Sequence, residues 1–353
     1  MSARKSLTDP PKNLKEAIDC VLRVSGRDNG NNDDQAIKGL AEELITLLDK
    51  DAGEVARGVL GVMGGTFDKV VGDLKTIEAT VYSKALQTYL SNVKRYFTTV
   101  SDYGTAVPEQ RRKTFIKCLE NDAKNGTGGP VSALADGLKK FIGYGNNGQP
   151  AGNGIIKNGG SYQSAYHGKQ WSDIEDQKNV CANIFLGVAP LIFYLLPFLY
   201  WKCKLTDEGG WTSKKLSDEP LKKFMEKMGF KTELNDSKKD SEVATLIGST
   251  CFSELETAYN AAKKGMPNPD PYYATVIRKL ELSQTKLCPS TSPLSRCYRI
   301  VSPFFTPNST YDVQSSSPAT PSFLGYSGLG ALAGGAYGFN LGGLGTFMSA
   351  LLA

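Results

Sequence analysis

The sequence predicts an all-α protein, and three observations carry this prediction. Apolar residues recur at spacings of three and four over most of residues 1–143, as they do on the buried face of a helix. Alternating apolar and polar runs, which would indicate strands, are almost missing. Glycine and proline gather in a few stretches, which separate the helical segments and mark one long loop and one linker.

The composition sets limits on the class of protein. The chain has 353 residues, of which 40% are hydrophobic, enough to build a packed core. The formal net charge is only +5, and Lys and Arg are mixed with Asp and Glu along the helical segments. A nucleic-acid groove normally needs a denser basic surface, so we expect no nucleic-acid partner.

The N-terminal helical region, 1–143, consists of several short helices. The first follows the Pro10-Pro11 breaker and carries Leu14, Ala17, Ile18, Val21, Leu22 and Val24. A loop at 26–34 separates it from a second helix at 37–48. Further helices are expected at 81–100, where the apolar stripe is unbroken, and near 108–121 and 130–142.

The rest of the chain divides by composition. A Gly- and Asn-rich segment, 144–172, predicts a long exposed loop. Residues 173–287 predict a second helical region, with helices at 173–201, 218–228, 239–248, 252–264 and 271–286. Residues 288–324 are rich in Pro, Ser and Thr and predict an extended linker, and residues 325–353 form an apolar, Gly-rich C-terminal segment.

The central hydrophobic segment, 180–201, has two interpretations. It carries no charged residue, and as a helix it would be about 33 Å long, enough to cross a bilayer. In that case it is a transmembrane helix, with Tyr200, Trp201, Lys202 and Lys204 as membrane-interface anchors. Alternatively, it is the buried central helix of an all-α domain, which is also apolar all round. The pattern fits both.

The C-terminal segment 325–353 is long enough to be a second anchor, yet its many glycines also suit a flexible apolar tail. The N-terminus has early positive charge without an apolar stretch behind it, so we expect no classical signal peptide. The two hydrophobic segments make a membrane-associated protein the expectation.

The seven cysteines are widely spaced and contain no CxxC pair, which argues against a structural zinc site. Cys288 and Cys297 lie nine apart in the proline-rich stretch and are the best candidates for a disulfide. Unpaired thiols fit the spacing equally well.

Motifs that would indicate catalysis are missing. His167 is the single histidine and falls in the Gly/Asn-rich segment, and the chain has no GxSxG, HExxH or GxxxxGK[ST] pattern. The glycine-rich stretch 58–65 fails the dinucleotide spacing and indicates a helix end or a close helix contact. We therefore expect a non-enzyme without catalytic, cofactor or metal residues.

Several stretches resemble the variant erythrocyte surface antigen family of Babesia. Residues 7–28, LTDPPKNLKEAIDCVLRVSGRD, are similar to that family's opening block, an LT-x-x-P-x-NLKEAID-x-x-LRV-x-GRD pattern. Residues 36–48 match the following block in character. The family's central hydrophobic block and the helix after it resemble three further stretches, residues 183–204, 209–216 and 221–230.

The resemblance implies a variable antigen on the infected erythrocyte surface, acting in antigenic variation and in cytoadhesion. Its implied partners are a heteromeric subunit of the same family and a host endothelial receptor. The alternative is a structural membrane subunit that supports partner chains without meeting a host ligand. Family members are usually longer and richer in cysteine, so the chain is expected to be a short or truncated member.

Overall fold

The computed structural model describes residues 5–28, 33–77, 119–144, 153–156, 162–166, 170–204, 221–230, 234–235 and 237–248, with scattered positions between 87 and 116 and at 215 and 219. The described part is helical, with isolated β-bridges and no strand, so the all-α prediction is confirmed for it. Its elements are α1 (Leu14–Val24), α2 (Asp34–Leu48), α3 (Ala52–Ile77), α6 (Pro130–Ile142), η2 (Trp171–Asp173), η3 (Glu175–Gln177), α7 (Lys178–Lys204), α8 (Leu221–Lys227) and α9 (Asp240–Leu246).

Helix α1 begins and ends where its capping residues require. The Asn13 side chain accepts a hydrogen bond from the Glu16 amide at 2.9 Å, which satisfies one of the free N–H groups of the first turn. At the other end Gly26 has a φ of +63°. Its N–H donates to the Arg23 carbonyl, and the Arg27 N–H donates to the Leu22 carbonyl, the two bonds of a Schellman ending.

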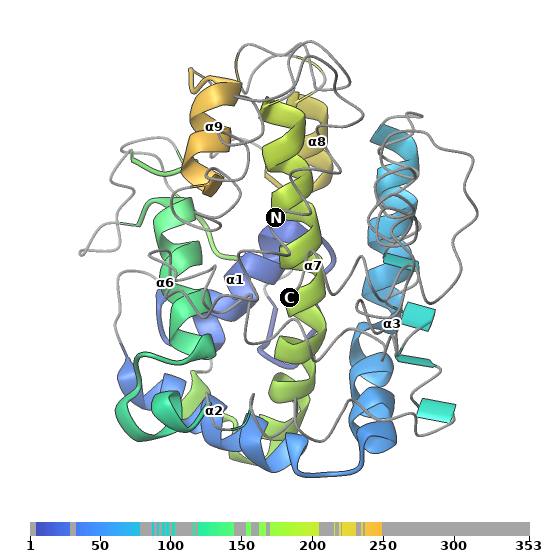
Figure 1. Ribbon diagram of the computed structural model, residues 1–353, viewed down its shortest axis with the longest axis vertical. Coiled ribbons are helices and arrows are strands. Elements are labelled where there is room, and N and C mark those ends of the chain that lie inside the picture. The colour runs from blue at the N-terminus through green and yellow to red at the C-terminus, as the bar shows by residue number, and fades with distance from the viewer. Residues whose placement is uncertain are drawn as a thin grey trace, which may run out of the picture.

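Helices α2 and α3 are joined by a short turn, and in Figure 1 α2 runs across the bottom of the molecule while α3 rises along its right side. Asp33 caps α2 by accepting from the amides of Gln35 and Ala36, so the helix begins three residues before the predicted 37. The glycine-rich stretch 58–65 lies inside α3 and is not a helix end. Gly58 does serve close helix contact, because a Cβ there would meet the side chain of Asn183 on α7.

Helix α7 is the centre of the assembly and contacts α1, α2, α3 and α9 (Figure 1). Its described side chains are buried around most of the helix, among them Ala182, Ile184, Phe185, Leu186, Val188, Ala189, Leu191, Ile192, Leu195, Leu196, Leu199 and Tyr200. At the crossing with α3, Gly187 lets Met63 and Val59 approach the α7 backbone. Burial by neighbouring helices therefore explains why this segment is apolar all round.

The transmembrane interpretation of 180–201 is wrong for this structure. None of the helices in the described part of the chain combines the length and hydropathy of a membrane span. The apolar side chains of α7 that the structure describes are instead buried in protein, and Tyr200, expected at a membrane interface in the spanning alternative, is 0% exposed in the core. Trp201, Lys202 and Lys204 belong to the last turn of α7.

The two predicted helical regions contribute to one hydrophobic core, which joins residues of α1, α2, α3 and α6 to residues of α7, α8 and α9. The segment 144–172 also enters this core: Ile155, Ile156, Tyr166 and Trp171 are buried, where an exposed loop was expected. The predicted helices 252–264 and 271–286, the linker 288–324, the segment 325–353, Cys288, Cys297 and His167 lie outside the described residues.

Candidate functional site

A stripe of charged side chains runs along α1 and is buried. Lys15, Asp19 and Arg23 follow one another at intervals of four and so share one face of the helix. They are 6%, 1% and 9% exposed. Charged residues are rarely buried unless they are paired, so each residue of this stripe is expected to have partners inside the fold.

Asp19 is the centre of the stripe and receives donors from two parts of the chain. Lys15 Nζ lies 2.9 Å from its Oδ2, one turn earlier on α1. The Tyr162 hydroxyl donates to Oδ1, and the Ala165 N–H donates to Oδ2 at 2.8 Å. The carboxylate thus fastens residues 162–165 to α1.

Lys15 also contacts this segment, and we call Lys15, Asp19 and their partners in residues 162–165 the Asp19 node. Its ammonium donates to the Gln163 carbonyl at 2.7 Å and lies 4.5 Å from the centre of the Tyr162 ring. Its own backbone N–H donates to the Met228 carbonyl after α8 at 2.9 Å. One residue of α1 therefore contacts both the 162–166 segment and the chain that follows α8.

Burial raises the pKa of the Asp19 carboxyl above its usual value, because desolvation penalises the charged form. The Lys15 charge and the hydrogen bonds from Tyr162 and Ala165 act in the opposite direction. With its oxygens engaged by protein donors and removed from water, Asp19 is arranged to hold two chain segments together.

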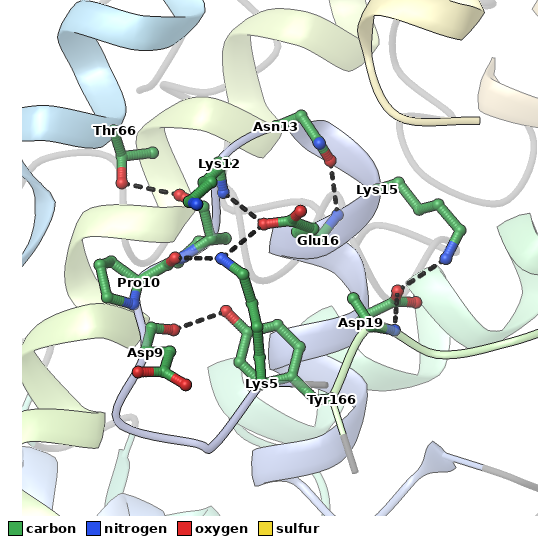
Figure 2. Close-up of polar contacts among 12 residues, drawn as sticks. Lys5, Asp9, Pro10, Lys12, Asn13, Lys15, Glu16, Asp19, Thr66 and Tyr166 are labelled. Carbon is green, nitrogen blue, oxygen red and sulfur yellow. Dashed lines mark hydrogen bonds and ion pairs between the residues drawn. The ribbon is translucent and has the colours of Figure 1, made fainter. Parts of the chain in front are cut away.

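A second layer of contacts continues the node toward the N-terminus (Figure 2). Lys5 Nζ lies 2.6 Å from Glu16 Oε2 and donates to the Pro10 carbonyl, while the Lys5 N–H donates to the Ala165 carbonyl at 3.0 Å. The Tyr166 hydroxyl donates to the Asp9 carbonyl at 2.7 Å. Residues 5–10 are thereby held between α1 and the 162–166 segment.

Two thiols lie behind this layer, Cys20 on α1 and Cys181 at the start of α7. Both are free and buried. Burial raises the pKa of Cys181 to about 12 and raises the pKa of Cys20 further still, with Cys181 itself a second cause. The reactive thiolate is therefore scarce at neutral pH, and these residues pack as small apolar groups.

The far end of the stripe is a second group of ion pairs. Arg23 Nη1 lies 2.8 Å from Asp28 Oδ2, and both side chains are nearly buried. Arg27, also buried, pairs with Asp34 of α2 at 2.6 Å and with Asp136 of α6 at 3.4 Å. These contacts join the end of α1 to two neighbouring helices.

The buried stripe was not among the sites predicted from sequence. The spacing of Lys15, Asp19 and Arg23 is visible in the sequence, but Tyr162 lies 143 positions from Asp19 in a segment without periodicity. The described residues contain no group of three or more His, Cys, Asp or Glu side chains that could hold a metal ion. In comparisons with known proteins, no family model, no curated protein and no solved structure matches this chain.

Proposed function

We propose that the chain is a non-catalytic variable surface antigen, displayed on the infected erythrocyte and related to the variant erythrocyte surface antigens of Babesia. Its role would be antigenic variation and adhesion to host endothelium, together with a partner subunit of the same family. The observation that carries the proposal is that residues of the opening block, 7–28, form the contacts that hold the helical scaffold together.

The residues that carry the resemblance in this block build the scaffold. Asn13 caps α1, Lys15 and Asp19 hold the 162–166 segment, and Gly26 adopts the left-handed conformation that ends the helix. Arg27 ties the block to α2 and α6. The residues of this block therefore specify the fold. A family with a common framework and variable surface segments requires such residues.

The central block supports the same interpretation. Residues 183–204 lie in α7, around which α1, α2, α3 and α9 pack, and residues 221–230 contain α8. Phe198 of α7 and Phe224 of α8 have ring centroids 5.6 Å apart. Both blocks that carry the resemblance therefore meet in one core, and this supports a shared helical framework.

External protease digestion of intact infected erythrocytes tests the surface display. Antibodies to residues 26–34 and to residues 205–217 would follow the two sides of α7 after treatment with trypsin. Because α7 is packed inside the fold, we expect both epitopes to be lost together. Retention of either epitope on intact cells, with loss after permeabilisation, would contradict display of the folded chain.

Adhesion separates the leading function from its alternative, a structural subunit that supports partner chains. The purified full-length chain is added to cultured endothelial cells, with heat-unfolded protein as the matched control. Saturable binding of the folded chain alone is expected for an adhesive antigen. Absence of binding, together with co-purification of a second parasite chain, would favour the structural subunit.

A further inference from the structure

Residues 5–11, which we call the N-terminal strap, form no helix and lie against four other parts of the fold. Lys5 Nζ lies 2.6 Å from Glu16 of α1, and Thr66 of α3 donates to the Pro11 carbonyl at 2.7 Å (Figure 2). The remaining contacts are to residues 165–166 and to the start of α7. The strap is thus fastened at a few points and has no helical hydrogen bonds of its own to hold it closed.

Cys181, near the N-terminal end of α7, lies directly beneath the strap. Its thiol donates to the Leu7 carbonyl at 3.4 Å. Cys181 and Leu7 are each 2% exposed, so Leu7 is an apolar anchor of the strap and lies against the thiol. Movement of Leu7 away from α7 would therefore remove part of the cover of Cys181.

Opening of the strap exposes far less apolar surface than unfolding of the whole chain. Leu7 and Pro11 are its buried residues, while the other residues of the strap are partly or fully exposed. Helix α7, by contrast, is buried by α1, α2, α3 and α9. A segment with few buried apolar contacts can open while the core stays folded. We therefore expect the strap to open at a lower free energy than the helices around α7.

We propose that the N-terminal strap is a lid whose opening makes Cys181 a site for thiol modification by a small disulfide. With the strap closed, burial raises the pKa of this thiol to about 12, so the reactive thiolate is scarce. Opening lets water reach the thiol and lowers its pKa toward the ordinary value of 9.0.

The reaction itself is thiol–disulfide exchange. The Cys181 thiolate attacks one sulfur of the small disulfide, whose S–S bond breaks as the mixed disulfide with Cys181 forms. The other half leaves as a thiolate and takes up the proton that Cys181 released. The proposal goes beyond surface display and does not depend on it.

Labelling of the folded full-length chain with cystamine, a small disulfide, tests the proposal when mass spectrometry follows the Cys181 peptide. Global unfolding exposes a large surface, so any labelling that requires it accelerates steeply with urea. Strap opening exposes little surface, and we expect the Cys181 labelling rate to be nearly independent of urea at low concentrations. A rate that follows global unfolding from zero urea upward would overturn the proposal.

Two matched variants separate strap opening from global unfolding. Leu7→Ala removes the anchor and should speed Cys181 labelling at least about 10-fold. Leu134→Ala removes a leucine that is 0% exposed in α6; it should lower the free energy of unfolding in urea and leave the Cys181 rate unchanged. If Leu134→Ala speeds the labelling as much as Leu7→Ala does, Cys181 is reached by global unfolding and the proposal is wrong.

A milder variant keeps the test valid if Leu7→Ala does not fold. Glu16→Gln removes the charge that faces Lys5 and keeps the size of the side chain. It should speed Cys181 labelling about threefold, as expected for the loss of one partly exposed ion pair. An unchanged labelling rate in Glu16→Gln would contradict the role of the Lys5 contact in holding the strap closed.

Discussion

Lys15 and Asp19 form an ion pair that is almost completely removed from water. Burying two charges is costly, and the cost is offset only when the remaining donors and acceptors are also satisfied. Here Gln163, Tyr162 and Ala165 supply those partners. The pair therefore depends on the 162–166 segment as much as that segment depends on the pair.

Replacing Asp19 by Ala should lower the free energy of unfolding by about 3–5 kcal/mol, because Lys15 is left buried without its counter-charge. The measurement is urea unfolding followed by circular dichroism at pH 7. Glu54→Ala is the matched control, since Lys50 and Glu54 have the same spacing on an exposed surface and should contribute less than about 1 kcal/mol. Similar losses of unfolding free energy in the two variants would show that the buried Asp19 pair contributes no more than an exposed pair.

The pKa of Asp19 gives a pH dependence with a definite sign. Its folded-state pKa is raised above the usual value of 3.8, so the native state binds this proton more readily than the unfolded chain does. The corresponding stabilisation is complete below pH 3.8 and is lost as the pH rises through the folded pKa. Relative to Asp19→Asn, the unmodified chain should therefore lose unfolding free energy as the pH rises toward 7. A difference that grows with pH would mean that attraction to Lys15 outweighs desolvation.

The sequence predicts the α1 residues of this site but not their partners. Lys15, Asp19 and Arg23 can be placed on one face of the predicted helix from their spacing alone. Their partners could not be predicted, because Ala165 lies 146 positions from Asp19 in a segment rich in Gly and Asn. The composition of this segment predicted exposure, yet its few large side chains are buried in the core.

Helix ends were predicted closely where proline and glycine mark them. Helix α6 occupies Pro130–Ile142, as predicted, with proline in its first turn and Gly143 after its last residue. Asp122 accepts hydrogen bonds from the amides of Gly129 and Val131 and so holds its start. Helix α3 was not predicted as one unit, because its internal glycines imitate a helix end.

Gly143 should be the least replaceable residue of this helix. Its φ is +89°, and a Cβ there would come within 2.6 Å of the Gly154 backbone. Gly143→Ala should cost about 1–3 kcal/mol from backbone strain alone, with the displaced Gly154 backbone adding to it. Gly72→Ala, inside α3 with open space around it, should instead stabilise the chain by about 0.5–1 kcal/mol. Thermal unfolding of both variants measures the contrast, and equal shifts of the same sign would refute it.

For the whole molecule, the decisive element is α7. A helix that is apolar on every side fits a membrane or a protein interior, and no periodicity separates the two. What decides between them is the packing of α1, α2, α3 and α9, which is a property of the assembled fold. The sequence could supply the helix and its two interpretations, while the tertiary structure was needed to choose.

Hydrogen exchange of the full-length chain in detergent-free buffer tests this central claim most directly. If α7 is the core around which the other helices pack, its amides should exchange only on global unfolding and be the slowest of the described residues. Asp19→Ala should speed their exchange to the same extent as it lowers the free energy of unfolding. Rapid exchange in α7 while α1 and α2 stay protected would contradict the account, because it would place this helix outside the core.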